Sequence, residues 1–262
     1  MEASVLIESR GPARWLRLNR PDVMNALSPA LLDALDLAIE QAAADASVRA
    51  LVVTGTGRAF CAGADLSSAL DSLASGNPAT LLGFVAHATA TLARLEALAM
   101  PVIGAVNGLA LAGGLELVLC CDLVIAAESA RFGDAHANYG LLPGAGGSVR
   151  LPRKIGATRA KRLLFTGEMV TAATMREGGL VNEVVPDAEL EGVVAKLVDA
   201  IAEKSPLSLR AMKQLVRDGL EQPVDTALRL EQLALASHVH SRDLREGLAA
   251  FREKRKPLFD GR

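Results

Sequence analysis

Residues 131–147, RFGDAHANYGLLPGAGG, combine side chains that can transfer protons with a chain that can turn sharply. They contain Asp134 and His136, one of only four histidines, together with five glycines. A histidine side chain can act as a general acid or base near neutral pH. The glycines do not form a common phosphate-binding signature, because no Gly-Lys-Ser/Thr follows and their spacing is not G-x-G-x-x-G after a strand. The segment is therefore a candidate wall of an active site.

Two further stretches place small residues directly after predicted strands: GRAFCAGADL over 57–66 and LAGGLELVLCCD over 111–122. Backbone N–H groups are uncovered at such turns and can point at a ligand oxygen, so two turns together can form an oxyanion hole. Either stretch alone is as typical of an ordinary turn or of close packing. The presence of both favours an anion-stabilising site.

Glu116 lies on the first turn of the helix that is predicted to begin near Gly113. It follows Gly113 by three residues and therefore lies on the same helical face. Its neighbours Leu115, Leu117 and Val118 are apolar. We expect them to desolvate the carboxylate partly and raise its pKa, which suits a group that transfers protons.

The hydrophobic pattern predicts an α/β protein. SVLIES and RWLRLNR alternate apolar and polar residues around RGPA, which predicts a hairpin. A helix follows, with Ser28 as its N-cap and Pro29 at its first position. Strands are then predicted over 48–55, 101–108 and 123–129, and helices over 80–99 and from 113 onward. Strands and helices that alternate in this way are typical of the α/β class.

A helical region is predicted to follow the α/β core. Beyond residue 190 no strand is predicted, and the helical segments cover 190–205, 206–220, 224–239 and 241–255. We therefore divide the chain into a core over 1–190 and a C-terminal helical region over 191–262. The apolar faces of these helices either cover the core or pack against another subunit.

Composition excludes several classes of function. Aromatic residues make up only 3% of the chain and the formal net charge is −2, which disfavours nucleic acid as a partner. The first twenty residues lack the pattern of a signal peptide, and no run of about 18 apolar residues suggests a membrane span. The three cysteines show no C-x-x-C spacing, which predicts reduced thiols in a cytoplasmic protein and no metal site.

The sequence resembles the crotonase superfamily, the enoyl-CoA hydratase/isomerase family, from LNRPDVMNALS to GLAAFREKRKPLF. The resemblance implies a crotonase-type superhelix of repeated β-β-α units, with C-terminal helices that assemble trimers or dimers of trimers. It implies an oxyanion hole for an acyl-thioester enolate, with donors at the amides of Ala62 and Gly113. It also implies that Glu116 is one of two acid/base groups that add water to a 2-enoyl-CoA in fatty acid metabolism.

One catalytic position departs from the hydratase pattern. Counted from FG to LPGAGG without a gap, the second glutamate of the family falls on His136. His136 can replace that carboxylate as the acid/base group, or Asp134 can substitute for it or orient His136. The third alternative is that the site runs a different enolate reaction, such as isomerisation, thioester hydrolysis or carbon–carbon bond cleavage. Cys61 is a weak candidate nucleophile, because no base is evident near it in the sequence.

The resemblance also implies where coenzyme A binds. The expected contacts are Met24, Ala26, Arg58, Ala64, Asp65, Leu66 and Lys254. Many family members carry lysine after the proline of NRP, whereas this chain has Asp22, which would repel a phosphate. Arg58 or Lys254 would then have to supply more of the positive charge.

The expected activity is therefore hydration of a 2-enoyl-CoA, without metal or dissociable cofactor, because coenzyme A is part of the substrate. The alternatives are a CoA-ester isomerase or hydrolase of the same fold, or a non-catalytic acyl-CoA- or RNA-binding member. The small residues over 67–80 are expected to form a mobile flap over the acyl chain.

Overall fold

The computed structural model describes residues 3–65 and 78–262, and its centre is a six-stranded sheet. The strand order is β1 (Val5–Arg10), β2 (Ala13–Leu18), β3 (Ala50–Gly55), β5 (Val102–Val106), β7 (Leu123–Ala127) and β10 (Glu183–Val185). β1 and β2 form the predicted hairpin, and the other neighbouring strands pair in parallel. Every residue of β3 and β5 is buried, as expected for strands with both faces covered.

A second, smaller sheet consists of β4 (Ala59–Cys61), β6 (Leu109–Leu111), β8 (Arg131–Gly133) and β9 (Val170–Thr171). β4, β6 and β8 each follow one strand of the large sheet along the chain and pair with each other in parallel. Long strand, short strand and helix therefore recur as a unit, which confirms the predicted α/β class and repeated β-β-α architecture.

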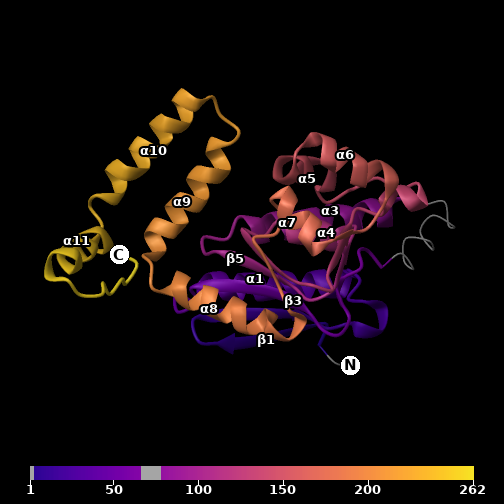
Figure 1. Cartoon of the computed structure of the whole chain (residues 1–262), viewed down its shortest axis with the longest axis horizontal. Coiled ribbons are helices and arrows are strands. Elements are labelled where there is room, and N and C mark those ends of the chain that lie inside the picture. The colour runs from indigo at the N-terminus through magenta and orange to yellow at the C-terminus, as the bar shows by residue number, and fades with distance from the viewer. Residues whose placement is uncertain (1–2, 66–77) are drawn as a thin grey trace.

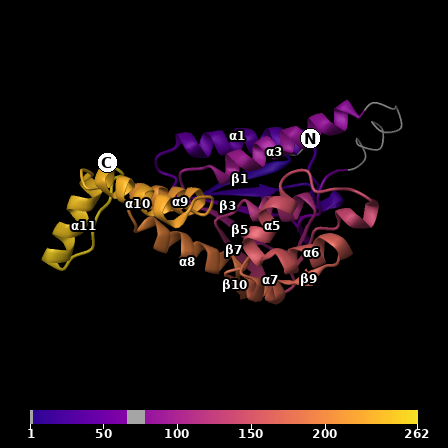
Figure 2. The same cartoon turned by 90° about the horizontal axis from the view of Figure 1, so that it is seen from above.

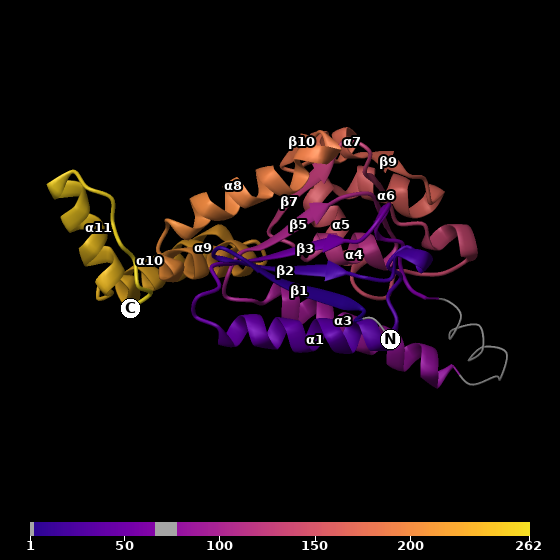
Figure 3. The ribbon, with the colours of Figure 1, turned by 90° about the horizontal axis from the view of Figure 1, so that it is seen from below.

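Helices cover both faces of the large sheet. α1 (Pro29–Ala44) and α3 (Ala79–Glu96) lie together on one side, and α8 (Leu190–Ala202) lies on the other (Figures 2 and 3). The predicted start of α1 is confirmed, because the Ser28 side chain accepts a hydrogen bond from the Leu31 amide. α8 buries Leu190, Val194 and Val198 in the same hydrophobic core as the strands. Packing therefore continues past the boundary that the sequence suggests at residue 190.

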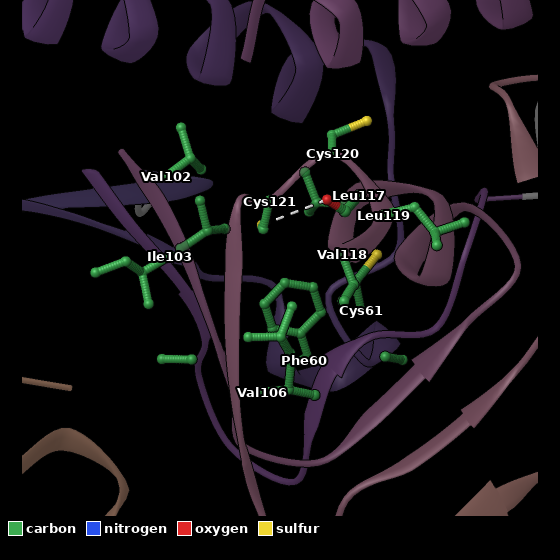
Figure 4. Packing of buried hydrophobic residues seen from close by; sticks show 14 of the residues in the cluster. Phe60, Cys61, Val102, Ile103, Val106, Leu117, Val118, Leu119, Cys120 and Cys121 are labelled. Carbon is green, nitrogen blue, oxygen red and sulfur yellow. Dashed lines mark hydrogen bonds between the residues drawn. The ribbon is translucent and has the colours of Figure 1, made fainter. Parts of the chain in front are cut away.

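α4 (Gly113–Leu119) is the most enclosed helix near the small sheet, since all of its residues are buried. Phe60 and Cys61 of β4 pack beside Val118 of α4 and Val106 of β5 (Figure 4). Gly114 permits this close approach, because a Cβ atom there would lie 1.9 Å from the carbonyl oxygen of Cys61. Only glycine therefore lets α4 sit this close to the strand that precedes the first small-residue turn.

The remaining elements of the core follow α4 along the chain. They are α5 (Gly147–Ile155), α6 (Ala157–Thr166), α7 (Ala172–Gly178) and the short 3-10 turns η1 (Pro21–Val23), η2 (His136–Tyr139) and η3 (Asp187–Glu189). α5 packs against both α4 and α6. The turn that leads into α5 is thereby brought next to the buried helix α4.

The last three helices extend away from the core (Figure 1). They are α9 (Pro206–Gly219), α10 (Val224–His238) and α11 (Arg242–Glu253), which confirms the helical pattern predicted for this region. α9 and α10 bury no residue, and they expose several large apolar side chains, among them Met212, Val216, Leu228 and Leu233. Among residues 3–65 and 78–262, no helix combines the length and apolar character needed to cross a membrane.

Candidate active site

Glu116 is a buried carboxylate with two backbone partners. Its side chain leaves α4 toward the turn before α5, where Oε1 accepts hydrogen bonds from the amides of Ala145 and Gly147, each at 2.8 Å. The residue is only 3% exposed. Burial raises the pKa of Glu116 above its ordinary value, although the Gly147 amide, His136 and the Ala145 amide each oppose the rise. The expected desolvation of this carboxylate is thus present. The sequence reasoning identified the glycine-rich turn but missed that two of its amides bind Glu116.

Asp134 and His136 form a pair beside this carboxylate. His136 Nδ1 lies 3.0 Å from Asp134 Oδ1, and the His136 backbone amide also lies 3.4 Å from that oxygen. Ala135 between them has a left-handed backbone conformation, with φ of 59°, which turns both polar side chains to the same side. If Nδ1 carries the proton that Asp134 accepts, Nε2 of the imidazole is left for another partner.

The Asp134–His136 pair and Glu116 share one site. A Cβ atom at Gly147 would lie 3.2 Å from Glu116 Oε1 and 3.2 Å from Asp134 Oδ2, so both carboxylates face this glycine. Asp134 is 1% exposed, and its Oδ2 has no hydrogen-bond partner among the described residues. Burial lowers the pKa of His136, but the carboxylates of Asp134 and Glu116 outweigh burial and raise this pKa above the ordinary 6.5. The arrangement therefore favours an imidazolium between two acidic groups.

The amide of Ala62, which the sequence suggests as an oxyanion donor, is already engaged. It donates to the carbonyl of Met24 at 3.0 Å. Ala64 instead forms a parallel bridge with Leu27, in which the Gly63 carbonyl and the Asp65 amide make the two hydrogen bonds. In such a bridge the amide of the middle residue points to the opposite side. The expectation for Ala62 is therefore corrected in favour of the Ala64 amide.

The amides of Ala64 and Gly113 border the same space. A Cβ atom at Gly113 would lie 3.6 Å from the Ala64 nitrogen, and one at Gly63 would lie 3.5 Å from the Gly113 nitrogen. Gly113 is the first residue of α4, where an amide has no partner within the helix. Ala112 just before it has φ of 47°, which is strained for a residue with a side chain. Two N–H groups on strained or glycine-rich backbone thus lie close together, which is one requirement of an oxyanion hole.

Some of the residues expected to bind coenzyme A surround the Ala64 turn. Asp65 pairs with Arg20 at 2.9 Å, and Arg20 also donates to the carbonyl of Ala26 at 2.6 Å. Met24 joins this group through its carbonyl, which accepts from Ala62. The sequence reasoning missed Arg20, which links the segment of Met24 and Ala26 to the segment of Ala64 and Asp65.

Other expected CoA contacts are placed differently. Arg58 is exposed next to Gly57, which approaches Pro21 and hence the exposed Asp22. Lys254 is the C-cap of α11, which lies far from α4 and α5 in the molecule (Figure 1). Within one chain Lys254 therefore does not meet the other candidate residues. Leu66 and residues 67–77 of the expected flap lie outside the described residues, whereas Thr80 lies in α3.

Cys61 is not a suitable nucleophile. Its side chain is fully buried among apolar residues, and burial raises the pKa of its thiol to about 12. The thiol therefore stays neutral at physiological pH, and a neutral thiol is a poor nucleophile.

Comparisons with known proteins agree with this geometry. The family model described as enoyl-CoA hydratase/isomerase matches residues 14–262. The chain is 41% identical over 247 residues to the putative enoyl-CoA hydratase/isomerase YngF of Bacillus subtilis, covering 94% of each protein. It is 38% identical over 257 residues to a crotonyl-CoA hydratase of Syntrophomonas wolfei, covering 98% of this chain and 97% of that protein. The crystal structure of an enoyl-CoA hydratase from Bacillus anthracis superposes with a TM-score of 0.93 at 39% identity, covering 99% and 100% of the two chains.

We predict that Asp134→Asn lowers the pKa of His136. The substitution removes a carboxylate that stabilises the imidazolium, whereas the burial that lowers the pKa remains. NMR titration of the imidazole protons in parent and variant measures the change. The imidazole signals of His87, which pairs with Asp36 on α1, serve as an internal control for effects outside the site. An unchanged pKa of His136 would show that Asp134 does not stabilise its charged form.

Proposed function

The chain belongs to the enoyl-CoA hydratase/isomerase family, and on that premise we propose that it adds water to the double bond of a 2-enoyl-CoA thioester. The observation that carries this proposal is the convergence of a buried, amide-bound Glu116 with the Asp134–His136 pair. Hydration needs one group to take a proton from water and another to deliver a proton to carbon. A site with two titrating groups meets that need.

The proposed oxyanion hole consists of the amides of Ala64 and Gly113. When hydroxide from water bonds to Cβ, electrons move through the double bond and negative charge develops on the thioester oxygen. Preorganised N–H groups stabilise this charge more than they stabilise the neutral carbonyl, and removal of one such donor typically costs about 2.7–4 kcal/mol. Both amides lack acceptors among the described residues, which leaves them available for substrate.

Glu116 and His136 are proposed to divide the proton transfers. Glu116 uses Oε1 for its two amide partners, so Oε2 is the oxygen available to take a proton from the attacking water. His136 has a raised pKa, which favours the charged imidazolium that can give a proton to Cα of the enolate. One proton is taken from water and one is delivered to carbon, so the product is the 3-hydroxyacyl-CoA. Transfer of the proton from Glu116 to His136 restores both groups.

We predict that the protein converts crotonyl-CoA to a product heavier by one water. We also predict that Glu116→Gln slows this turnover at least about a hundredfold. The amide keeps the shape of the side chain and removes the base, so KM should change little. Loss of the absorbance of the conjugated thioester follows the reaction, and product mass identifies it. Unchanged mass with an altered spectrum would indicate isomerisation, and free CoA would indicate hydrolysis. Turnover of Glu116→Gln within a few-fold of the parent would remove Glu116 from the mechanism.

We predict a bell-shaped pH dependence of kcat/KM that His136 limits on the alkaline side. Glu116 must be ionised, so activity rises with pH through a pKa above the ordinary 4.5. His136 must be protonated, so activity falls as pH passes through a pKa above 6.5. His136→Ala should be severely impaired and should lack the alkaline limb.

The variant His136→Glu is the matched test of this assignment, because it restores the carboxylate of the hydratase pattern and should retain activity on crotonyl-CoA. If His136→Ala keeps near-parent activity while Asp134→Asn loses it, Asp134 carries the proton and the role of His136 is structural. If neither change matters and no enoyl-CoA gains water, the hydratase proposal is wrong.

The chain is further proposed to work as a trimer or a dimer of trimers. Support comes from the exposed apolar residues of α9 and α10, which would otherwise remain in contact with water. Lys254 fits this proposal, because in an assembly the basic end of α11 can approach the CoA of a neighbouring chain.

We predict that solution scattering at micromolar concentration gives a mass that is three or six times the 27.3 kDa of one chain. Leu233→Glu on α10 should lower that mass, because a charge on an interface surface is costly to bury. Leu82→Glu on the exposed start of α3 is a control that should leave the mass unchanged. A monomeric mass for the parent protein would contradict the proposal.

A reducing compartment such as the cytoplasm is proposed as the site of action. Cys61, Cys120 and Cys121 are all free and buried, which agrees with thiols that are kept reduced. The proposed chemistry uses protein groups and the CoA of the substrate, and it calls for no metal or dissociable cofactor.

A further inference from the structure

Arg150 of α5 forms a hydrogen bond with the turn that binds Glu116. Its Nη1 donates to the carbonyl of Ala145 at 2.9 Å, while Nε and Nη2 donate to Glu96 at the end of α3, at 3.0 and 2.7 Å from Oε2. We propose that Arg150 is a positioning residue for the hydration reaction: held by Glu96, it fixes the two amides that orient the Glu116 carboxylate. This inference rests on the proposed function, since it concerns the base of that reaction.

The peptide groups of the turn explain how Arg150 can act through Glu116. Three consecutive peptide groups are involved. The N–H groups of the first and third, which belong to Ala145 and Gly147, donate to Glu116. The carbonyl of the middle one, which belongs to Ala145, accepts a hydrogen bond from Arg150. A rotation of the middle peptide would misdirect both amides. The hydrogen bond from Arg150 opposes that rotation, so it maintains the orientation of the carboxylate without touching substrate.

The guanidinium is itself held in place. A Cβ atom at Gly146 would lie 1.9 Å from Arg150 Nη1, so the guanidinium packs directly over this glycine, whose φ is 110°. Two-pronged pairing with Glu96 fixes the plane of the guanidinium, and the Arg150 side chain is only 18% exposed. The Thr89 hydroxyl of α3 lies 3.0 Å from the carbonyl oxygen of Gly144 and 2.8 Å from that of Val85, and its one proton can go to either. α3 therefore contacts the turn through Thr89 as well as through Glu96.

Arg150 also contributes charge to this region. The positive guanidinium and the Glu116 carboxylate interact electrostatically, as do Arg150 and the neighbouring Cys120 thiol. The other titratable groups around Glu116 are Asp134 and His136, while Lys154 of α5 lies near Cys120. Burial raises the pKa of Cys120 to about 12, so this thiol stays neutral while Glu116 titrates.

The first test compares Arg150→Met with Arg153→Met. Arg153 lies three residues further along α5 and pairs with the exposed Glu221, so it is a matched control outside the turn. Arg150→Met should lower kcat about tenfold or more with little change in KM, and it should move the acid limb of kcat/KM to higher pH. Arg150→Lys should lie between parent and Arg150→Met, because lysine keeps the charge without the planar fork. Arg153→Met should match the parent.

The second test asks whether Arg150 acts through Glu116. In a Glu116→Gln background, Arg150→Met should reduce the residual rate much less than it reduces the parent rate, because the two changes remove the same contribution. Equal fold losses in both backgrounds would overturn the proposal. So would an unshifted acid limb in a folded Arg150→Met protein, or an equal shift in Arg153→Met. Glu96→Gln, which keeps the side-chain shape, should give a weaker effect in the same direction and replaces Arg150→Met if that variant does not fold.

A third measurement separates this proposal from the proposed activity. NMR titration of ¹³C-labelled glutamate carboxyl carbons, with the Glu116 signal identified by its loss in Glu116→Gln, reports the Glu116 pKa without any turnover. Arg150→Met should raise that pKa, because a nearby cation and the alignment of two amide donors are lost together. A raised pKa in a protein that hydrates no enoyl-CoA would reject the hydratase proposal and retain the positioning role. An unchanged pKa would reject the positioning role.

Discussion

The buried carboxylate of Glu116 is the constraint on which the site depends. A carboxylate in an apolar helix is costly unless hydrogen bonds replace its water. The two amides that do so, from Ala145 and Gly147, come from a turn that must lie directly against α4. Gly147 favours that approach, because a Cβ atom there would lie 3.2 Å from the carboxylates of Glu116 and Asp134, which is tighter than most such contacts. The glycine-rich turn before α5 therefore serves to solvate a side chain.

The same constraint explains how a histidine can be accommodated opposite Glu116. Two ionised carboxylates in one buried site repel each other, and this repulsion raises the pKa of one of them. His136 introduces a positive group there, and Asp134 supplies a second negative group that stabilises it. The positive φ of Ala135 brings this pair together, at the cost of local strain. In the proposed mechanism, imidazole in place of a carboxylate changes the proton donor and places opposite charges in contact instead of like ones.

The sequence predicted the long elements and the location of the site, but not which amide faces it. β3, β5 and α1 were predictable because their apolar patterns extend over many residues, whereas β4, β6 and β8 have only three residues each and carry no readable period. In a regular strand, amides two residues apart point the same way, which would make Ala62 and Ala64 equivalent. Gly63 has φ of 107°, so this regularity is broken there. Ala62 then bonds to Met24, while Ala64 is left facing Gly113.

The position of Lys254 differs from what the family resemblance implies for it. The resemblance to the family implies that Lys254 lies near the CoA phosphates, yet a single chain places α11 far from α4 (Figure 1). α9 and α10 bury none of their residues, so burial of apolar side chains in the core of their own chain does not fix their position. Apolar surface of this extent is stabilised when another surface covers it. The proposed oligomer therefore accounts for two features together: it covers these helices, and it provides Lys254 with a neighbouring site within reach.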